Sequence, residues 1–197
     1  MKNYLRLLII LFVFWGCADI EKVPESTWGT IQEKILKTSC INCHVSGSVM
    51  TKQSGLDLSR NDSYSKLVGV TPKNIAAKND GLVIVSNEGG MKGLSKSYLW
   101  EKINAPDKDH FYADHPQYGE IMPLGMDFLT NGQLEFIRQW IVAGAPETGA
   151  VADSSLLQDS VRFVDVLFEL VSKLSILRLS LTKVHPLKIC LDFLLML

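Results

Sequence analysis

The sequence predicts a mainly helical domain with long loops. Helical patterns of apolar residues stand near both ends of residues 27–150, the first leading up to a pair of cysteines and the last stopping at a Gly and a Pro. The stretch between them, from Ser46 to Asp80, is rich in Gly, Ser, Asn and Lys and has only short apolar clusters. We therefore expect loops and brief helices between two firmer helices.

The first helix is expected to begin near Trp28 and to run on to the cysteines. Trp28, Ile31 and Ile35 recur at i, i+3 and i+7, and Thr30 and Glu33 have the spacing of a capping box. The apolar stripe would face the core, while the last turn delivers the cysteines to their site.

Two segments in the second half of the domain are also apolar. Residues 82–86 (LVIVS) fit a short strand or an extended buried stretch, because one apolar run does not separate the two. Residues 97–103 (SYLWEKI) are expected to form a helix, and Pro106 lies just beyond its end.

The last helix has the clearest signals. Thr130 and Gln133 have capping-box spacing, and Gly144 followed by Pro146 supplies a stop. The apolar stripe between them consists of Leu134, Phe136, Ile137, Trp140 and Ile141.

Residues 40–44 read CINCH, which is the spacing of covalent haem c attachment. On one helical turn Cys40, Cys43 and His44 project from the same side, so two thiols and an imidazole can meet one porphyrin. A zinc site would need four ligands and would have to recruit Cys190 or a distant His, and a thiol redox pair would need a thioredoxin-like βαβ context. The sequence supplies neither context, so we predict one covalent haem c held through Cys40 and Cys43.

His44 is then the expected proximal ligand of the haem iron. One ring nitrogen would bond iron, while the other should donate to a carbonyl that orients the ring. For the sixth ligand we favour Met122, because GEIMPLG places a thioether in a loop shaped by Pro123, just before the last helix. The other candidates are Met50, Met91, Met126, His110 and His115.

The start of the chain predicts export. Lys2 and Arg6 form a positive region, and residues 7–15 (LLIILFVFW) are apolar but too short to span a membrane, so residues 1–16 are expected to be a signal peptide. Cys17 directly after Gly16 resembles the lipidation site of bacterial lipoproteins, which makes residues 17–26 a tether. The alternative is an ordinary secretory signal and a soluble periplasmic protein.

Five short motifs follow one another along the chain: CINCH at 40–44, GLDLS at 55–59, SYLWEKI at 97–103, IMPLG at 121–125 and FIRQWIVAGAPETG at 136–149. In this order they resemble the monohaem cytochrome c-like domains of bacterial exported proteins, including planctomycete-type cytochromes and those fused to larger redox enzymes. The resemblance implies a cytochrome c-like helical domain with long loops wrapped around one covalent haem. It also implies His44 and Met122 as axial ligands, the last helix packed across the first, and Trp140 as a core anchor.

Residues 151–197 depart from that resemblance. From Ser160 onwards the tail is rich in Leu, Val and Ile, but charges interrupt it and its last apolar run, PLKICLDFLLML, is shorter than a bilayer requires. Two interpretations remain: an amphipathic segment that docks on a partner or a membrane, or a sequence produced by a reading-frame change. Cys190, an unpaired thiol in an exported chain, fits the second.

The charge balance excludes one class of partner. With 20 basic and 21 acidic residues the net charge is −1, which leaves no electrostatic footprint for nucleic acid. Since His/Met ligation fills both axial positions, we expect a one-electron carrier, membrane-tethered on the periplasmic side, that serves a periplasmic or membrane redox protein. The alternatives are an electron-donor module of a larger oxidoreductase, and a haem enzyme or sensor with an open sixth site.

Overall fold

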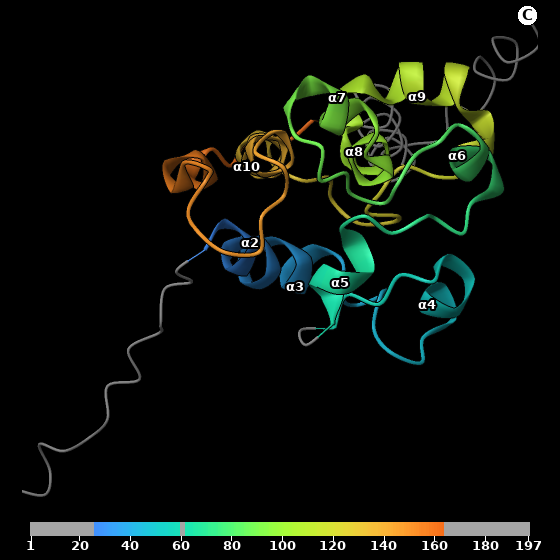
Figure 1. Ribbon diagram of the computed structural model, residues 1–197, viewed down its shortest axis with the longest axis horizontal. Helices are drawn as coiled ribbons and strands as arrows, with labels where there is room; N and C mark the ends of the chain where they lie inside the picture. The colour runs from blue at the N-terminus through green and yellow to red at the C-terminus, as the bar shows by residue number, and fades with distance from the viewer. Residues whose placement is uncertain (1–25, 60–61, 164–197) are drawn as a thin grey trace, which may run out of the picture.

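The computed structural model describes residues 26–59 and 62–163, and this part of the chain has a mainly-α fold (Figure 1). Within it there is no strand, and the helical elements are α2 (Thr27–Thr30), η1 (Ile31–Leu36), α3 (Lys37–Ser39), α4 (Val49–Ser54), α5 (Ser63–Leu67), α6 (Ile75–Asn79), α7 (Gly90–Ser95), α8 (Tyr98–Ile103), η2 (Ala105–Asp107), α9 (Lys108–Asp114), η3 (Pro116–Tyr118), α10 (Asn131–Val142) and η4 (Ser154–Gln158). The predicted signal peptide, tether and lipidated Cys17, and also Cys190, lie outside the described residues.

The predicted first helix is present as α2, η1 and α3, but its start differs from the prediction. Ser26 is the N-cap, and its hydroxyl accepts a hydrogen bond from the Gly29 amide. The predicted capping box at Thr30 and Glu33 is wrong, because Thr30 already lies in the helix and its hydroxyl donates to the Ser26 carbonyl. The middle of the helix, η1, has π-helical hydrogen bonding, a geometry often found near functional sites.

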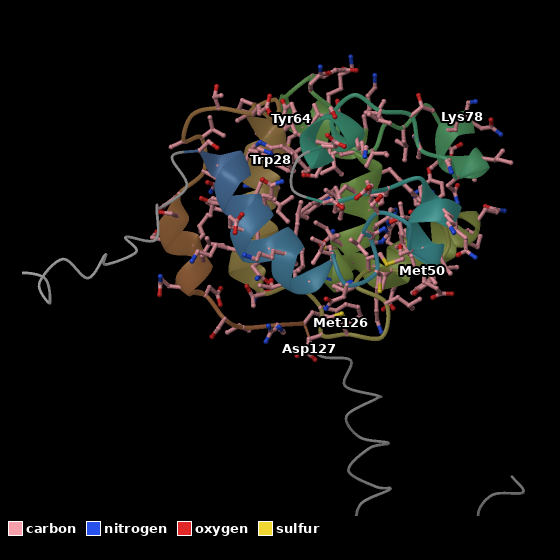
Figure 2. The ribbon with its side chains drawn as sticks, turned by 90° about the horizontal axis from the view of Figure 1, so that it is seen from below. Trp28, Met50, Tyr64, Lys78, Met126 and Asp127 are labelled. Atoms are coloured by element: carbon pink, nitrogen blue, oxygen red, sulfur yellow. The ribbon has the colours of Figure 1, made fainter. Side chains whose placement is uncertain are left out.

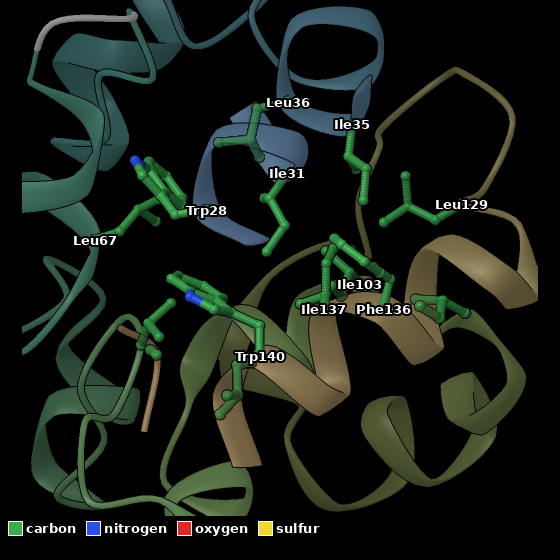
Figure 3. Close-up of a cluster of buried hydrophobic side chains, with 14 of the residues drawn as sticks. Trp28, Ile31, Ile35, Leu36, Leu67, Ile103, Leu129, Phe136, Ile137 and Trp140 are labelled. Atoms are coloured by element: carbon green, nitrogen blue, oxygen red, sulfur yellow. The ribbon is translucent and has the colours of Figure 1, made fainter. Parts of the chain in front are cut away.

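The first helix packs against α10 to form the main core of the domain. The rings of Trp28 and Trp140 are stacked with centroids 5.3 Å apart, and Trp140 is fully buried (Figure 3). Ile31, Ile35 and Ile137 extend the same contact along both helices. The expected role of Trp140 as a core anchor is therefore confirmed.

The predicted last helix is confirmed at both ends. Thr130 caps α10, and both hydrogen bonds of its capping box with Gln133 are present. After α10 the chain turns at Gly144 (φ +88°) and folds back over the tryptophans. Trp140 Nε1 donates to the Pro146 carbonyl at 2.9 Å, and the Tyr64 hydroxyl donates to the Ala145 carbonyl at 2.8 Å.

The packed part of the chain continues past residue 150. η4 lies against the start of α10 so closely that a Cβ at Gly132 would meet the Leu156 carbonyl oxygen at 1.9 Å. The Asn131 amide donates to the Val161 carbonyl, and Thr130 forms an isolated antiparallel bridge with Arg162. Residues up to Arg162 therefore belong to the same compact unit.

A second, smaller cluster is formed by side chains of α6, α9, η3 and the segment that follows η3. Its buried members are Ala77, Phe111, Tyr118 and Ile121, and Tyr98 packs against them. Sequence patterns missed α7 and α9, whereas α8 agrees with the helix predicted over 97–103.

The segment 82–86 is the extended buried stretch rather than a strand. Val83 and Val85 make isolated parallel bridges, with Ser97 and Val68 respectively. No helix in the described ranges is long and apolar enough to cross a membrane.

Candidate haem site

The turn that carries the cysteines follows directly on α3. Cys40 caps the helix, and its carbonyl accepts hydrogen bonds from the amides of Cys43 (3.2 Å) and His44 (3.0 Å). These bonds close one turn of chain, which is the local geometry that the CINCH spacing predicts. Cys40 is half-buried against the main core, while Cys43 is exposed.

The position of the Cys40 thiol disfavours its ionised form. Burial, and in second place the neighbouring Cys43, raise its pKa to about 12. The raised pKa disfavours the thiolate, which is the form that thiol redox exchange uses. In the described ranges no three His, Cys, Asp or Glu side chains are grouped to hold a metal ion.

His44 is held at two points by the segment that follows α4. Its Nδ1 lies 3.3 Å from the Leu56 carbonyl, and its own carbonyl accepts from the Leu58 amide at 2.8 Å. Burial lowers the pKa of the imidazole, which favours the neutral ring that iron binds. With Nδ1 facing a carbonyl, Nε2 is the nitrogen left for a ligand, so the carbonyl contact expected from the sequence is present.

Residues 55–59, the GLDLS motif, owe their shape to short polar side chains. The Thr51 hydroxyl donates to the Leu56 carbonyl at 3.1 Å, and the Asp57 carboxylate accepts from the Ser59 amide and hydroxyl. The Lys66 ammonium lies 3.5 Å from the other carboxylate oxygen of Asp57. The motif thus forms a rigid acceptor for the His44 ring.

An apolar cavity opens beside Cys40, between the first helix and α10 (Figure 3). Its lining comes from α5, α8 and the loop before α10 as well as from these two helices: Trp28, Ile31, Ile35, Leu36, Cys40, Leu67, Leu99, Ile103, Leu129, Ile137 and Trp140. The cavity is about 20 Å³ in volume, so the elements that line it would have to move apart to admit a porphyrin. Its apolar lining and the donors close to it in the chain still suit a haem, because Cys40 lines the cavity and Cys43 and His44 follow in the same turn.

Met122 is the candidate sixth ligand that packs against this same core. It is half-buried and shares the main core with Cys40. The other methionine candidates are exposed: Met50 by 42% and Met126 by 43%, both labelled in Figure 2, and Met91 by 65%. The structure therefore brings Cys40 and Met122 to one cluster and leaves these three methionines at the surface.

His110 and His115 lie on and just after α9, where they contact one another. Their ring centroids are 5.8 Å apart, and the His110 imidazole faces the carboxylates of Asp107 and Asp114. His115 stacks on Tyr118 with ring centroids 4.4 Å apart. Neither histidine belongs to the main core that contacts Cys40.

Sequence reasoning missed Lys102, which is only 9% exposed and contacts the segment leading to Met122. Burial lowers the pKa of its ammonium to about 8. Tyr98 and Lys102 stand four residues apart on α8, so a lysine sharing a helix face with an aromatic ring was the available signal.

Comparison with protein families, with curated proteins and with solved structures finds no match to this chain. The case for its function therefore rests on the chain's own residues.

Proposed function

We propose that this chain binds one haem c and carries single electrons. Cys40 and Cys43 would form thioethers by adding their S–H bonds across the two vinyl groups of the haem, and His44 and Met122 would be the axial ligands. The observation that carries the proposal is the turn at 40–44, in which Cys40 lines an apolar cavity and the His44 Nδ1 faces the Leu56 carbonyl.

A haem held by Cys40, Cys43, His44 and Met122 would supply one-electron redox chemistry, and no position on its iron would be left for a substrate. The chain's own residues have three tasks. The cysteines fix the group, the Leu56 carbonyl orients the His44 ring, and the apolar wall excludes water.

The proposed setting is the periplasmic side of a bacterial membrane, with Cys17 carrying the lipid and a periplasmic or membrane redox protein as partner. The basis is the apolar stretch of residues 7–15 followed by Cys17. Mass spectrometry of the mature N-terminus tests it, because a diacylglyceryl group on Cys17 is expected and a free N-terminus would leave a soluble periplasmic protein.

The test of haem binding is to export the full chain together with a haem c maturation system and to record oxidised, reduced and CO-treated spectra. We expect haem that survives denaturing electrophoresis, a low-spin spectrum, a thioether-to-iron charge-transfer band and no CO shift. His44→Ala should prevent accumulation of stable holoprotein.

Met122→Ala tests the sixth ligand against Met126→Ala, a control that removes an exposed thioether from the same loop. Met122→Ala should abolish the charge-transfer band and admit CO, while Met126→Ala should leave both unchanged. An open, CO-binding iron in the unaltered protein would favour the haem enzyme or sensor instead. A low-spin protein that passes electrons only to a larger oxidoreductase would make it that enzyme's donor module, and absence of haem would refute the proposal.

A further inference from the structure

The segment 118–122, which leads into Met122, starts at the last residue of η3 and then continues outside helix and strand, and none of its residues makes a β-bridge. Apart from the turn bond from the Tyr118 amide to His115, its backbone is held by contacts with α8 and by the hydroxyl groups of tyrosines. Buried carbonyls in a segment outside helix and strand cannot pair within a regular element, so they need hydrogen-bond donors from other parts of the chain.

Lys102 supplies most of these partners. Its Nζ donates to the Tyr118 carbonyl at 3.1 Å and also to the Glu120 carbonyl. Its own backbone carbonyl accepts from the Met122 amide at 2.6 Å. One residue of α8 thus contacts three alternate positions of the segment, ending at the proposed ligand.

The aromatic rings around Lys102 keep its side chain in place. Nζ lies 5.2 Å from the centroid of the Phe111 ring and 5.8 Å from that of Tyr98, both within the range of cation–π attraction. The Tyr98 hydroxyl donates to the same Tyr118 carbonyl at 2.7 Å. From the other side, the Tyr112 hydroxyl accepts from the Ile121 amide and donates to the Glu120 carboxylate.

We propose that Lys102 is a positioning residue that holds residues 118–122 so that the Met122 side chain stays directed at the haem site. This inference rests on the proposed function, in which Met122 is the sixth ligand. It adds a residue that is not itself a proposed ligand and that acts through the backbone of Tyr118, Glu120 and Met122.

A side chain without donors cannot replace the ammonium. Lys102→Met keeps the length and apolar stem, but it removes the ammonium donor from the Glu120 carbonyl and leaves the Tyr118 carbonyl with the Tyr98 hydroxyl alone. A carbonyl that is shielded from water and loses a charged donor costs free energy. The segment should therefore shift toward water and move Met122 with it. The backbone bond from Met122 to residue 102 remains possible in the variant, so the segment should loosen rather than detach.

The experiment compares Lys102→Met with Lys78→Met in the full-length holoprotein, since Lys78 is an exposed lysine on α6 (Figure 2). CO affinity of the reduced protein and amide hydrogen exchange of residues 118–122 are measured. We expect Lys102→Met to raise CO affinity about tenfold or more, which corresponds to one lost hydrogen bond to a charged group, and to accelerate exchange. Lys78→Met should match the unaltered protein, and an equal result for Lys102→Met would overturn the inference.

The double variant Lys102→Met/Met122→Ala shows whether Lys102 acts through Met122. If it does, CO affinity should equal that of Met122→Ala alone, because nothing remains to be positioned. An additional rise in the double variant would overturn the positioning role. If Met122→Ala itself leaves CO binding unchanged, Met122 is not the ligand, and the ligand assignment and the inference fall together.

Tyr112→Phe decides the matter if Lys102→Met yields no holoprotein. Tyr112 is 41% exposed, so loss of its hydroxyl should not prevent folding, yet it removes the contacts to Ile121 and Glu120. A smaller rise in CO affinity together with faster exchange at 118–122 would support the inference. Unchanged CO affinity and exchange would overturn it.

Discussion

The two apolar clusters of this domain differ in chemistry and in what they hold. The main core is built from aliphatic side chains and two stacked tryptophans that join the first helix to α10. The smaller cluster combines Ala77 and Ile121 with Phe111, Tyr118 and Tyr98, and the Tyr98 hydroxyl and the buried Lys102 ammonium both donate to the Tyr118 carbonyl.

This difference suggests a division of labour. Cys40 and Met122 both contact the main core, so this core forms the wall of the proposed haem site. The smaller cluster instead fixes the path of the chain into Met122, since its polar ends reach Tyr118 and Glu120. Variants in the first cluster should unfold the domain, and variants in the second should release one segment.

Trp140→Ala should have the largest effect on stability. It removes a fully buried indole stacked on Trp28 and the hydrogen bond to the Pro146 carbonyl. Truncation of a buried Trp costs about 3–5 kcal/mol in the free energy of unfolding, measured by urea denaturation followed by circular dichroism. Trp140→Phe is the control, because it keeps an aromatic ring and should lose less than half as much; equal losses would mean that stacking on Trp28 contributes little.

Phe111→Ala should lower the free energy of unfolding less than Trp140→Ala does, and its effect should be confined to the smaller cluster. Phe111 is 1% exposed at the centre of the smaller cluster, next to Tyr118 and Ile121. We expect a loss of about 3 kcal/mol, the lower end for a buried Phe, seen by hydrogen exchange as faster exchange in residues 98–121 while α10 stays protected. Tyr112→Ala, at the exposed neighbouring position, should cost under about 1 kcal/mol. If α10 and residues 98–121 lose protection together, the two clusters unfold as one unit and the division of labour is wrong.

Removing one hydroxyl from each cluster gives a finer comparison. Tyr118→Phe loses a 2.7 Å hydrogen bond to the Asp80 carboxylate, and Tyr64→Phe loses a 2.8 Å bond to the Ala145 carbonyl. Hydrogen bonds to charged groups contribute about 1.5–3 kcal/mol and neutral ones about 1 kcal/mol, so Tyr118→Phe should be the more destabilising in urea titrations. The reverse order would mean that the turn after α10 depends more on its hydrogen bond than the smaller cluster does.

The two clusters also differ in how far sequence predicted them. The main core was predictable from apolar periodicity and capping signals. Trp28 and Ile31 lie on one apolar face of the first helix, and Thr130 caps its own helix, so each signal is local in the sequence. The error at Thr30 has a local cause: its hydroxyl donates to the Ser26 carbonyl, and Ser26 caps the helix instead.

The smaller cluster depends on contacts that no local pattern encodes. Lys102 reaches carbonyls 16 and 18 residues further along the chain, so its role depends on where the fold places residues 118–120. α7 contains two glycines and α9 is mostly polar, so neither has the apolar stripe that marks a helix. For the site, the turn at 40–44 was predictable from the spacing of its residues. The sequence also predicted that a carbonyl would face His44, but it did not show that this carbonyl belongs to Leu56.

Asp57→Asn should have the smallest effect and should depend on pH. Hydrogen bonds from Ser59, and then the nearby Lys66, hold the pKa of the Asp57 carboxyl below its usual 3.8. A carboxyl with a lowered folded-state pKa stabilises the fold above pH 3.8, and this contribution is lost as pH falls through and below that value.

Asp57→Asn should therefore cost under about 1 kcal/mol at pH 7 and flatten the decline in stability between about pH 5 and pH 2.5, measured by urea titrations across that range. Asp62→Asn is the matched control, because Asp62 faces the same lysine at 3.3 Å with an exposed side chain, and exposed ion pairs contribute little to stability. If Asp62→Asn flattens the acid decline as much as Asp57→Asn does, the charge on Lys66 matters more than the Ser59 hydrogen bonds, and the GLDLS segment beside His44 is less rigid than its contacts imply.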